Sequence, residues 1–349
     1  MKAMVLHGIN DFRLETVKEP VLGEGEVLVA VKAAGICGSD IPRVFRTGTY
    51  SFPLIPGHEF SGIVVKVRDA ENAGWLGQRV GIFPLMPCRT CPLCQKKQFE
   101  MCRNYSYLGS RRDGGFAEYV SVPAQNLISL PDEVSFEEAA MLEPMAVAVH
   151  AMRGMKLTPF DTVAVCGLGT IGILLLIFLL DAGVKKVLAV GNKELQKQAV
   201  LDLGIPESCY CDSRVTDVNV WIAGQTHGMG ADVFFECVGK EETFIQAVEN
   251  AAPKGRICLV GNPGSDIKLK KSVYWKVLRN QLKIIGTWNS SFTGDAEDDW
   301  HFALERLLKG CIAPGKLISH RFSLEELQQG FYIMRDKSEE YGKIMGIIN

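Results

Sequence analysis

Four of the 11 cysteines lie in one short segment, at the spacing Cys-x2-Cys-x2-Cys-x7-Cys. Thiolates at such short intervals on a loop can converge tetrahedrally on one Zn²⁺. Pro87 and Pro92, with the polar residues around them, favour a loop over a helix or a strand. The spacing therefore predicts a structural zinc site, formed by Cys88, Cys91, Cys94 and Cys102.

Other interpretations of this segment stay open. Iron–sulfur clusters are bound by cysteines at similar spacings. Unligated thiols and disulfides also fit the spacing, although a cytosolic protein keeps its thiols reduced. A zinc lobe can also bind nucleic acid, but the basic residues near this one are too few to favour that function: Arg89, Lys96, Lys97 and Arg103.

A second set of potential metal ligands is more dispersed. Cys37 follows the alternating segment Glu26–Lys32, and His58 and Glu59 are adjacent in the sequence Pro-Gly-His-Glu-Phe-Ser-Gly. Each is a weak signal alone, because a single cysteine is usually a small buried hydrophobe and a single histidine is more often structural. Together, a soft thiolate and an imidazole suit a catalytic zinc site that keeps an open position. The remaining cysteines are expected to pack in the core or lie at the surface: Cys166, Cys209, Cys211, Cys237, Cys258 and Cys311.

A dinucleotide-binding pattern occupies residues 162–172. The apolar strand Val163–Cys166 leads into Gly-Leu-Gly-Thr-Ile-Gly, and the helical segment Ile173–Leu180 follows. The motif G-x-G-x-x-G is weak alone, but a strand before it and a helix after it make it a dinucleotide fingerprint. Its glycines allow a tight turn and a close approach of the backbone to a pyrophosphate at the helix N-terminus. The candidate cofactor-binding residues here are Gly167, Gly169, Thr170, Ile171 and Gly172.

The end of the next predicted strand bears on the choice between NAD and NADP. An NAD enzyme usually carries Asp or Glu about 20 residues beyond the fingerprint, where it binds the ribose 2′-hydroxyl. Here that position is Gly191, followed by Asn192 and Lys193. Without a repelling carboxylate, a 2′-phosphate has room and a nearby positive charge, so NADP is favoured and NAD remains possible. In the alternative interpretation, Gly191 is only a turn residue and Lys193 a solvated surface charge.

The composition is that of a folded globular protein without a strong charge bias. The 349 residues suggest two domains, at about 150 residues per domain. With 47% hydrophobic residues and a net charge of −2, the chain can bury a core and lacks a basic field for nucleic acid or anionic membranes. The most apolar stretch, Ile171–Leu180, is shorter than the roughly 20 residues that span a bilayer, and the first residues lack the apolar core of a signal peptide. We therefore expect a cytoplasmic protein with no membrane and no nucleic-acid partner.

The order of the predicted elements indicates an α/β fold with a Rossmann-type, doubly wound parallel sheet and a second, β-rich domain. Residues 1–147 contain short strands between Gly and Pro turns, as in a barrel-like domain. Residues 148–286 alternate strands and helices, as a doubly wound sheet requires. Residues 287–349 are expected to fold back onto the first domain, with helices at Asp299–Leu308 and Phe322–Met334. Further elements expected in the Rossmann region are strands at Lys186–Val190, Val233–Cys237 and Arg256–Val260, and helices around Glu194–Leu203 and Glu241–Ala252.

Four separated features follow one another along the chain: Gly57–Gly62 (Gly-His-Glu-Phe-Ser-Gly), the four-cysteine segment, Glu143-Pro144 and the central G-x-G-x-x-G. Together they resemble the zinc-dependent medium-chain dehydrogenase/reductase family, across essentially the whole chain. The resemblance implies a GroES-like catalytic domain beside the Rossmann domain, and hydride transfer between a secondary alcohol and a nicotinamide cofactor. Within the family, the segment Leu108–Tyr119 is most similar to dehydrogenases of polyol phosphates.

The resemblance also implies two zinc ions per chain. The catalytic ion would be held by Cys37, His58 and Glu143, and Glu59 could approach it when water leaves. Glu143 does not follow from spacing, because other glutamates lie nearby; the Glu-Pro pair selects it. The four clustered cysteines would hold the structural ion. Ser39 occupies the position at which the family often uses a hydroxyl to relay the substrate proton.

A polyol phosphate is the substrate class that the resemblance favours. Arginines near the predicted chemistry are candidate phosphate ligands, because a guanidinium meets phosphate oxygens in two parallel charge-assisted bonds: Arg43, Arg46, Arg111 and Arg112. Unphosphorylated polyols and L-threonine remain alternative substrates, and a catalytically silent nucleotide-binding sensor is an alternative of another class. The family also implies a homodimer or homotetramer, with Leu282–Trp288 resembling its inter-subunit strand.

Overall fold

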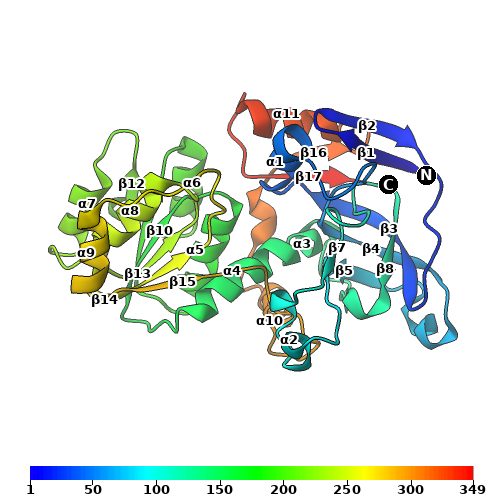
Figure 1. The fold of residues 1–349 in the computed structure, drawn as a ribbon, viewed down its shortest axis with the longest axis horizontal. Helices are drawn as coiled ribbons and strands as arrows, with labels where there is room; N and C mark the ends of the chain where they lie inside the picture. The colour runs from blue at the N-terminus through cyan, green and yellow to red at the C-terminus, as the bar shows by residue number, and fades with distance from the viewer. Residues whose placement is uncertain (349) are drawn as a thin grey trace. The chain divides into compact units, whose positions relative to one another are not determined.

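Parallel strands form one sheet in residues Met145–Ser290, one of the two units into which the chain divides (Figure 1). The computed structural model describes residues 1–348. The strands of this sheet are β10 (Thr162–Cys166), β11 (Lys186–Gly191), β12 (Tyr210–Asp212), β13 (Ala231–Glu236), β14 (Ala251–Leu259) and β15 (Lys283–Gly286). They lie in the order β12–β11–β10–β13–β14–β15, and every neighbouring pair is parallel. Parallel neighbours need crossover connections, and here each crossover contains a helix.

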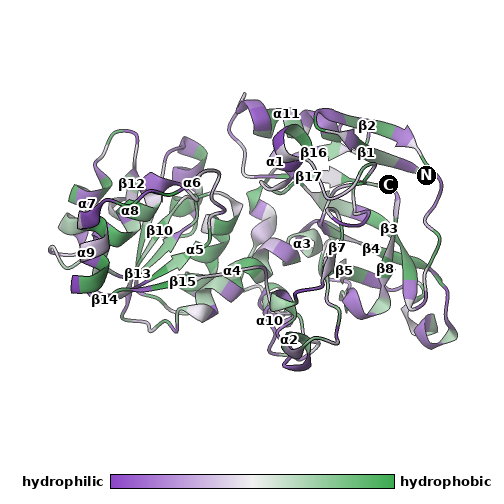
Figure 2. Cartoon of the chain, in the orientation of Figure 1, coloured by the Kyte–Doolittle hydropathy of each residue, from purple (hydrophilic) through white to green (hydrophobic). Residues whose placement is uncertain are grey.

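The crossover helices cover a strongly apolar sheet. They are α5 (Thr170–Asp181), α6 (Glu194–Asp202), α7 (Val218–Gln225), α8 (Glu241–Asn250) and α9 (Lys271–Arg279). In α5, every residue from Gly172 to Leu179 is buried, and Figure 2 shows this helix and the strands beside it as largely hydrophobic. A helix that is apolar all round is a buried helix, so the most apolar stretch of the chain belongs to a core. In the part of the chain that the structure describes, no helix has both the length and the apolarity to cross a membrane.

The predicted succession of strand, glycine-rich turn and helix is confirmed in this unit. The helix begins at Thr170, earlier than expected, because the extended residue Gly169 is its N-cap. The helix predicted around Glu241–Ala252 ends at Asn250 instead. Ala251 already belongs to β14 and pairs with β13, so its backbone hydrogen bonds go to the sheet.

A second, largely antiparallel sheet organises the other unit, which consists of Met1–Pro144 and the C-terminal segment from Ser291. Its strands are β3 (Glu26–Gly35), β4 (Glu59–Val67), β5 (Arg79–Ile82), β8 (Tyr119–Pro123), β9 (Leu127–Ser129), β16 (Ile318–Ser323) and β17 (Lys343–Ile347). The order is β16–β17–β3–β4–β5–β9, with β8 also paired to β3. Because β3 pairs with β17, the C-terminal segment completes a sheet whose first strand along the chain is β3.

Short elements complete this unit. Two small sheets pair β1 (Lys2–Gly8) with β2 (Asp11–Thr16), and β6 (Leu85–Met86) with β7 (Ser106–Tyr107). The α-helices are α1 (Asp40–Pro42), α2 (Pro92–Gln95), α3 (Phe136–Ala140), α10 (Asp299–Leu308) and α11 (Leu327–Asp336). The first of the two boundaries between the units falls in α4 (Leu142–Gly154), and the second falls between Ser290 and Ser291.

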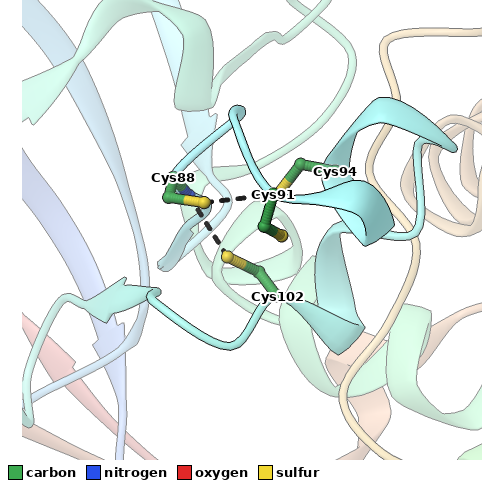
Figure 3. Close-up of side chains that lie close together, drawn as sticks. All are labelled: Cys88, Cys91, Cys94 and Cys102. Carbon is green, nitrogen blue, oxygen red and sulfur yellow. Dashed lines mark hydrogen bonds between the residues drawn. The ribbon is translucent and has the colours of Figure 1, made fainter.

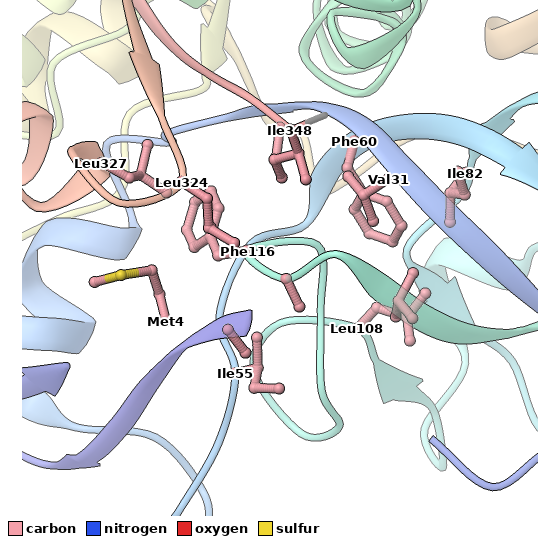
Figure 4. Packing of buried hydrophobic residues seen from close by; sticks show 14 of the residues in the cluster. Met4, Val31, Ile55, Phe60, Ile82, Leu108, Phe116, Leu324, Leu327 and Ile348 are labelled. Carbon is pink, nitrogen blue, oxygen red and sulfur yellow. The ribbon is translucent and has the colours of Figure 1, made fainter. Parts of the chain in front are cut away.

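The core of this unit draws residues from both ends of the chain (Figure 4). Phe60 of β4, Phe116 and Leu327 of α11 are all fully buried in one cluster. Phe116 and Phe331 pack with their rings 5.6 Å apart in an edge-on contact. Burial of these large apolar side chains fixes the return segment against the strands that carry the candidate metal ligands.

One predicted helix in the return segment is shorter than expected. Phe322 and Ser323 belong to β16, which pairs with β17, and α11 begins only at Leu327. The apolar spacing correctly indicated a helix in this segment. Phe322 and Ser323 are nevertheless extended, because their backbone groups pair with β17. The predicted α/β fold class, with a parallel sheet and a second β-rich unit, is confirmed.

Candidate metal centres and cofactor site

The four clustered cysteines converge in the segment between β6 and β7 (Figure 3). Their Sγ atoms all lie within 4.8 Å of one another. Cys88 donates its backbone N–H to Cys102 Sγ at 3.3 Å, and its own Sγ lies 3.9 Å from that of Cys94. Cys91 is the N-cap of α2, whose single turn brings Cys94 back towards it. Tight turns therefore bring the four thiols together.

This four-cysteine cluster fits a bound metal ion. Cys94 and Cys102 are buried, and burial raises the pKa of the Cys94 thiol to about 12. Crowded thiols packed beside Phe99 can all ionise only when a cation compensates their charge. A closed set of four sulfur ligands is typical of structural zinc and of some iron–sulfur clusters.

Cys37, His58 and Glu59 form the second group of potential metal ligands. The pairing of Gly35 with Glu59 brings the end of β3 beside the start of β4. One possible ligand atom from each of the three residues lies within 4.8 Å of the others. The Ser39 hydroxyl donates to Cys37 Sγ at 3.3 Å. Residues distant in the sequence therefore meet because two antiparallel strands reach the same edge of the sheet.

Asp40 supports this cluster from a fully buried position. Its carboxylate accepts the backbone N–H of Cys37 at 3.0 Å and pairs with Arg43. Its Oδ1 lies 3.4 Å from His58 Nδ1, a buried nitrogen without a well-formed hydrogen bond. Burial opposes charge on the imidazole, but Asp40 and Cys37 outweigh it and raise the pKa of His58 well above its ordinary value. The negative groups around this imidazole therefore favour a positive charge here, and they would favour a bound metal cation in the same way.

Glu143 lies close to the cluster but outside its tight group of three. It is buried near the start of α4 and accepts a hydrogen bond of 3.2 Å from the Tyr107 hydroxyl. Burial raises the pKa of Glu143 to about 7, while the nearby positive charge of His58 opposes the rise and Glu59 adds to it. The sequence did not single out Tyr107, because a tyrosine beside many turn residues carries no signal of its own.

A buried ion pair joins the cluster to the C-terminal strand. Lys343 of β17 pairs with the carboxylate of Glu59, and both side chains are 2% exposed. A Cβ atom at Gly35 would lie 2.5 Å from Glu59 Oε2 and 2.6 Å from Lys343 Cε, so glycine leaves the room that the pair needs. Lys343 carries no signal in the sequence, because it is 284 residues from Glu59. Glu59 is therefore both a potential ligand and the partner of a lysine.

The donor set of this second cluster fits a catalytic zinc ion. Thiolate, imidazole and carboxylate are all ligands that Zn²⁺ accepts. His58 and Glu59 are buried, whereas Cys37 is partly exposed. Mixed ligands, with a further carboxylate nearby, are typical of catalytic zinc sites, whereas four cysteines are typical of structural ones. The chain thus contains two metal-binding clusters of different chemical character.

The glycine-rich turn after β10 has the geometry of a nucleotide-binding loop. Gly167 has a φ of 96°, in the region that favours glycine. A Cβ atom at Gly172 would lie 2.0 Å from the carbonyl oxygen of Gly167, so the first turn of α5 packs directly on the loop. The first N–H groups of a helix have no partner within it, and α5 presents those of Thr170 and Ile171 beside this loop. The arrangement can hold a pyrophosphate.

Polar side chains border the end of β11, where Gly191 lacks an acidic side chain. Lys193 is the N-cap of α6. Ser213 donates its backbone N–H and its hydroxyl to the Gly191 carbonyl oxygen, at 2.9 and 3.1 Å. The next residue, Arg214, forms a bidentate pair with Asp212. Arg214 was not expected here from the sequence, because only the pairing of β11 with β12 brings it to this end of the sheet.

The structure divides the four candidate phosphate ligands into two kinds. Arg43 pairs with Asp40, and Arg112 pairs with Glu26 at 2.5 Å, so buried carboxylates compensate both charges. Two exposed arginines have no carboxylate partner within residues 1–348: Arg46 and Arg111.

A β-rich unit with two metal-ligand clusters and a unit with a dinucleotide-type parallel sheet define the class of metal-dependent dehydrogenases. Residues 23–132 match the alcohol dehydrogenase GroES-like domain, and residues 170–309 match the zinc-binding dehydrogenase domain. Galactitol 1-phosphate 5-dehydrogenase of Escherichia coli K12 is 32% identical to this chain over 320 residues, covering 90% of each. The chain belongs to the zinc-dependent medium-chain dehydrogenase/reductase family of oxidoreductases, which confirms the resemblance seen in the sequence.

Solved structures and a further relative agree with this assignment. The crystal structure of galactitol-1-phosphate dehydrogenase from Escherichia coli has a TM-score of 0.89 and 31% identity, covering 99% of this chain and 100% of that one. A protein described as a zinc-binding dehydrogenase from Sinorhizobium meliloti 1021, bound to NADP, has a TM-score of 0.88 and 29% identity, covering 99% and 98%. An alcohol dehydrogenase from Escherichia coli CFT073, complexed with NADH, has a TM-score of 0.89 and 26% identity, covering 99% of each chain. Sorbitol dehydrogenase of Bacillus subtilis is 27% identical over 350 residues, covering 99% and 96%. The family is thus one of NAD(P)-binding alcohol and polyol dehydrogenases.

Proposed function

We propose that this protein oxidises a secondary hydroxyl of a polyol phosphate and passes the hydride to a nicotinamide cofactor, giving a keto-sugar phosphate. The observation that carries the proposal is the cluster of Cys37, His58 and Glu59 beside Glu143, in a chain 32% identical to a galactitol 1-phosphate 5-dehydrogenase. The reaction balances, because the alcohol loses a hydride to the oxidised cofactor and a proton to the protein or solvent.

The proposed metal ligands are Cys37, His58 and Glu143, with Glu59 as a residue that can approach the ion. When bound, Zn²⁺ supplies Lewis acidity, which eases deprotonation of a secondary alcohol near neutral pH. Ser39 is the proposed proton relay, since its hydroxyl already lies beside the cluster at Cys37 Sγ. Glu59 and Glu143 are buried and Cys37 is partly buried, so electrostatic interactions within the cluster are stronger than they would be in water.

A structural zinc ion at the four cysteines would bring the total to two per chain. In this proposal, residues 1–147 and 287–349 form the catalytic domain and residues 148–286 bind the dinucleotide. A reducing, cytoplasmic location suits thiolate ligands, and the cysteines of the described residues are free of disulfides.

A homo-oligomer, dimer or tetramer, is part of the same proposal. All residues of β15, Lys283–Gly286, are exposed, and β15 is the last strand of its sheet. The open edge of such a strand presents unpaired backbone groups that a second copy of the chain can bind.

NADP is the proposed preferred cofactor. Lys193 lies two residues beyond Gly191, at the strand end where the ribose 2′ position is bound in this type of fold, whereas Asp212 already compensates the charge of Arg214. Replacing Lys193 by alanine is expected to lower kcat/KM for NADP about tenfold or more and to leave the value for NAD nearly unchanged, because only NADP carries the 2′-phosphate. Lys185→Ala is the matched control, since this exposed lysine precedes the opposite end of β11. A strong preference for NAD that Lys193→Ala does not change would contradict the proposal.

The alternative substrates are unphosphorylated polyols and L-threonine. The similarity to a sorbitol dehydrogenase over 99% of the chain favours the polyol among these. Steady-state rates across polyol phosphates, free polyols and amino alcohols test the proposed function. The highest kcat/KM on a polyol phosphate supports it, and the highest value on a free polyol or on L-threonine overturns it. Tight cofactor binding without turnover on any of them would indicate a sensor.

A further inference from the structure

We propose that Arg111, which lies over the rings of Tyr50 and Tyr105, receives the phosphate of the substrate. The inference rests on the proposed function and adds the anion-binding part of the same substrate site. All of these residues belong to the unit that contains Met1–Pro144.

The guanidinium of Arg111 lies over two aromatic rings. Its Cζ lies 4.2 Å from the centroid of the Tyr50 ring and 4.3 Å from that of Tyr105. Its terminal N–H groups donate to the Tyr50 hydroxyl at 3.2 Å and to the Tyr105 carbonyl oxygen at 3.3 Å. Contact with the two rings restricts the guanidinium without neutralising its charge, and the N–H groups that these two hydrogen bonds do not use remain available as donors. An oriented fork of this kind matches the oxygens of a phosphate.

Arg111 differs from two of the other candidate phosphate ligands in that no carboxylate of the described residues compensates its charge. Arg43 and Arg112 each have a buried carboxylate partner, Asp40 and Glu26 respectively. A phosphate that bound either arginine would have to displace that carboxylate or lie beside its negative charge, and both are costly in a buried place. No carboxylate lies within ion-pair distance of Arg111 in the described chain, so its charge is available to an anion.

A row of aromatic rings connects Arg111 with the metal-ligand cluster. Tyr105 meets Tyr107 edge-on, with ring centroids 6.4 Å apart. Tyr107 donates its hydroxyl to Glu143, and its ring centroid lies 5.8 Å from that of His58. A substrate with its hydroxyl at the cluster and its phosphate at Arg111 would lie along this row.

Arg335 offers a matched control. Its Cζ also lies over two rings, 4.8 Å from the centroid of Phe45 and 4.7 Å from that of Tyr332. Unlike Arg111, it donates from Nε to Asp336 at 2.7 Å, so its charge is compensated. Arg335→Ala therefore tests whether the loss of any stacked arginine changes substrate preference.

The first test compares kcat/KM for galactitol 1-phosphate and galactitol in the zinc-loaded wild type and in Arg111→Ala. Loss of a charge-assisted contact is expected to lower the value for the phosphorylated substrate about 10- to 100-fold and to change that for the free polyol much less. Arg335→Ala is expected to leave the ratio unchanged. If Arg111→Ala keeps the wild-type ratio of kcat/KM for galactitol 1-phosphate to that for galactitol, Arg111 is not the phosphate ligand. The same conclusion follows if Arg46→Ala lowers this ratio and Arg111→Ala does not. In both cases the wild type still prefers the phosphorylated substrate, so the proposed function survives. A wild type that does not prefer the phosphorylated substrate overturns both the proposed function and the role of Arg111.

The second test uses inorganic phosphate as the probe. Phosphate is expected to inhibit wild-type oxidation of galactitol competitively, with an inhibition constant that rises about tenfold or more in Arg111→Ala. Tyr50→Phe keeps the ring and is expected to retain inhibition, whereas Tyr50→Leu removes the stack and is expected to weaken it. Equal inhibition of the wild type and Arg111→Ala would show that the anion binds elsewhere.

Discussion

Replacing Cys37 by serine is expected to lower turnover about 1,000-fold or more while the protein remains folded. The hydroxyl is a far poorer zinc ligand than the thiolate, so the cluster with His58 and Glu59 loses its softest donor. Lewis-acid stabilisation contributes several kcal/mol to such reactions, which corresponds to a loss of this size. The measurements are kcat, the zinc content per chain and the thermal unfolding curve of the same preparation. Zinc content is expected to fall from about two to about one per chain.

Cys311→Ser is the control for this experiment, because Cys311 is exposed and belongs to neither metal-ligand cluster. It is expected to keep both zinc ions and the normal rate. If Cys37→Ser retains a near-normal rate, Cys37 is not a ligand of the catalytic ion and the site has been assigned wrongly.

Replacing Cys94 by serine is expected to affect stability first. Its buried thiol lies 3.9 Å from Cys88 Sγ inside the four-cysteine cluster, and structural zinc sites contribute directly to folding free energy. We expect a loss of at least about 4 kcal/mol, or a fall in Tm on the order of 10 °C. Differential scanning calorimetry and metal analysis check the result. The kcat of molecules that remain folded is expected to stay within a few-fold of normal.

A buried cysteine outside both clusters provides the matched control. Cys258→Ala removes such a thiol from β14 and is expected to cost only about 1 kcal/mol, with both zinc ions retained. If Cys94→Ser keeps its zinc and its Tm, the four cysteines are not a structural metal site.

Local sequence was sufficient to predict the features whose parts lie close together in the chain. The cysteines from Cys88 to Cys102 need only tight turns to converge, and their spacing alone indicated a metal site. The glycine motif from Gly167 to Gly172 lies between a strand and a helix that periodicity predicts well. Glu143 was different, because only the resemblance to a known family selected it among neighbouring glutamates.

Features that depend on tertiary pairing were not predictable in this way. Lys343 meets Glu59 because β17, β3 and β4 are neighbours in one sheet, although 284 residues separate the two side chains. The arginines near the site looked equivalent in the sequence, and only the position of Glu26 beside Arg112 shows that this charge is already compensated. Phe322 was assigned to a helix because its hydrophobic spacing suited one, whereas its pairing with β17 places it in a strand.

The most direct test of the proposed function is the ratio of kcat/KM for galactitol 1-phosphate to that for galactitol, measured with one preparation of the zinc-loaded wild type. The proposed site predicts that the phosphate contributes on the order of 2–4 kcal/mol to transition-state binding, a ratio of about 30 to 1,000. Such a ratio would show that this metal-dependent dehydrogenase recognises a phosphorylated polyol. Equal efficiency on the two substrates would overturn the proposed function, because no phosphate site would then be needed and the protein would be a dehydrogenase of free polyols.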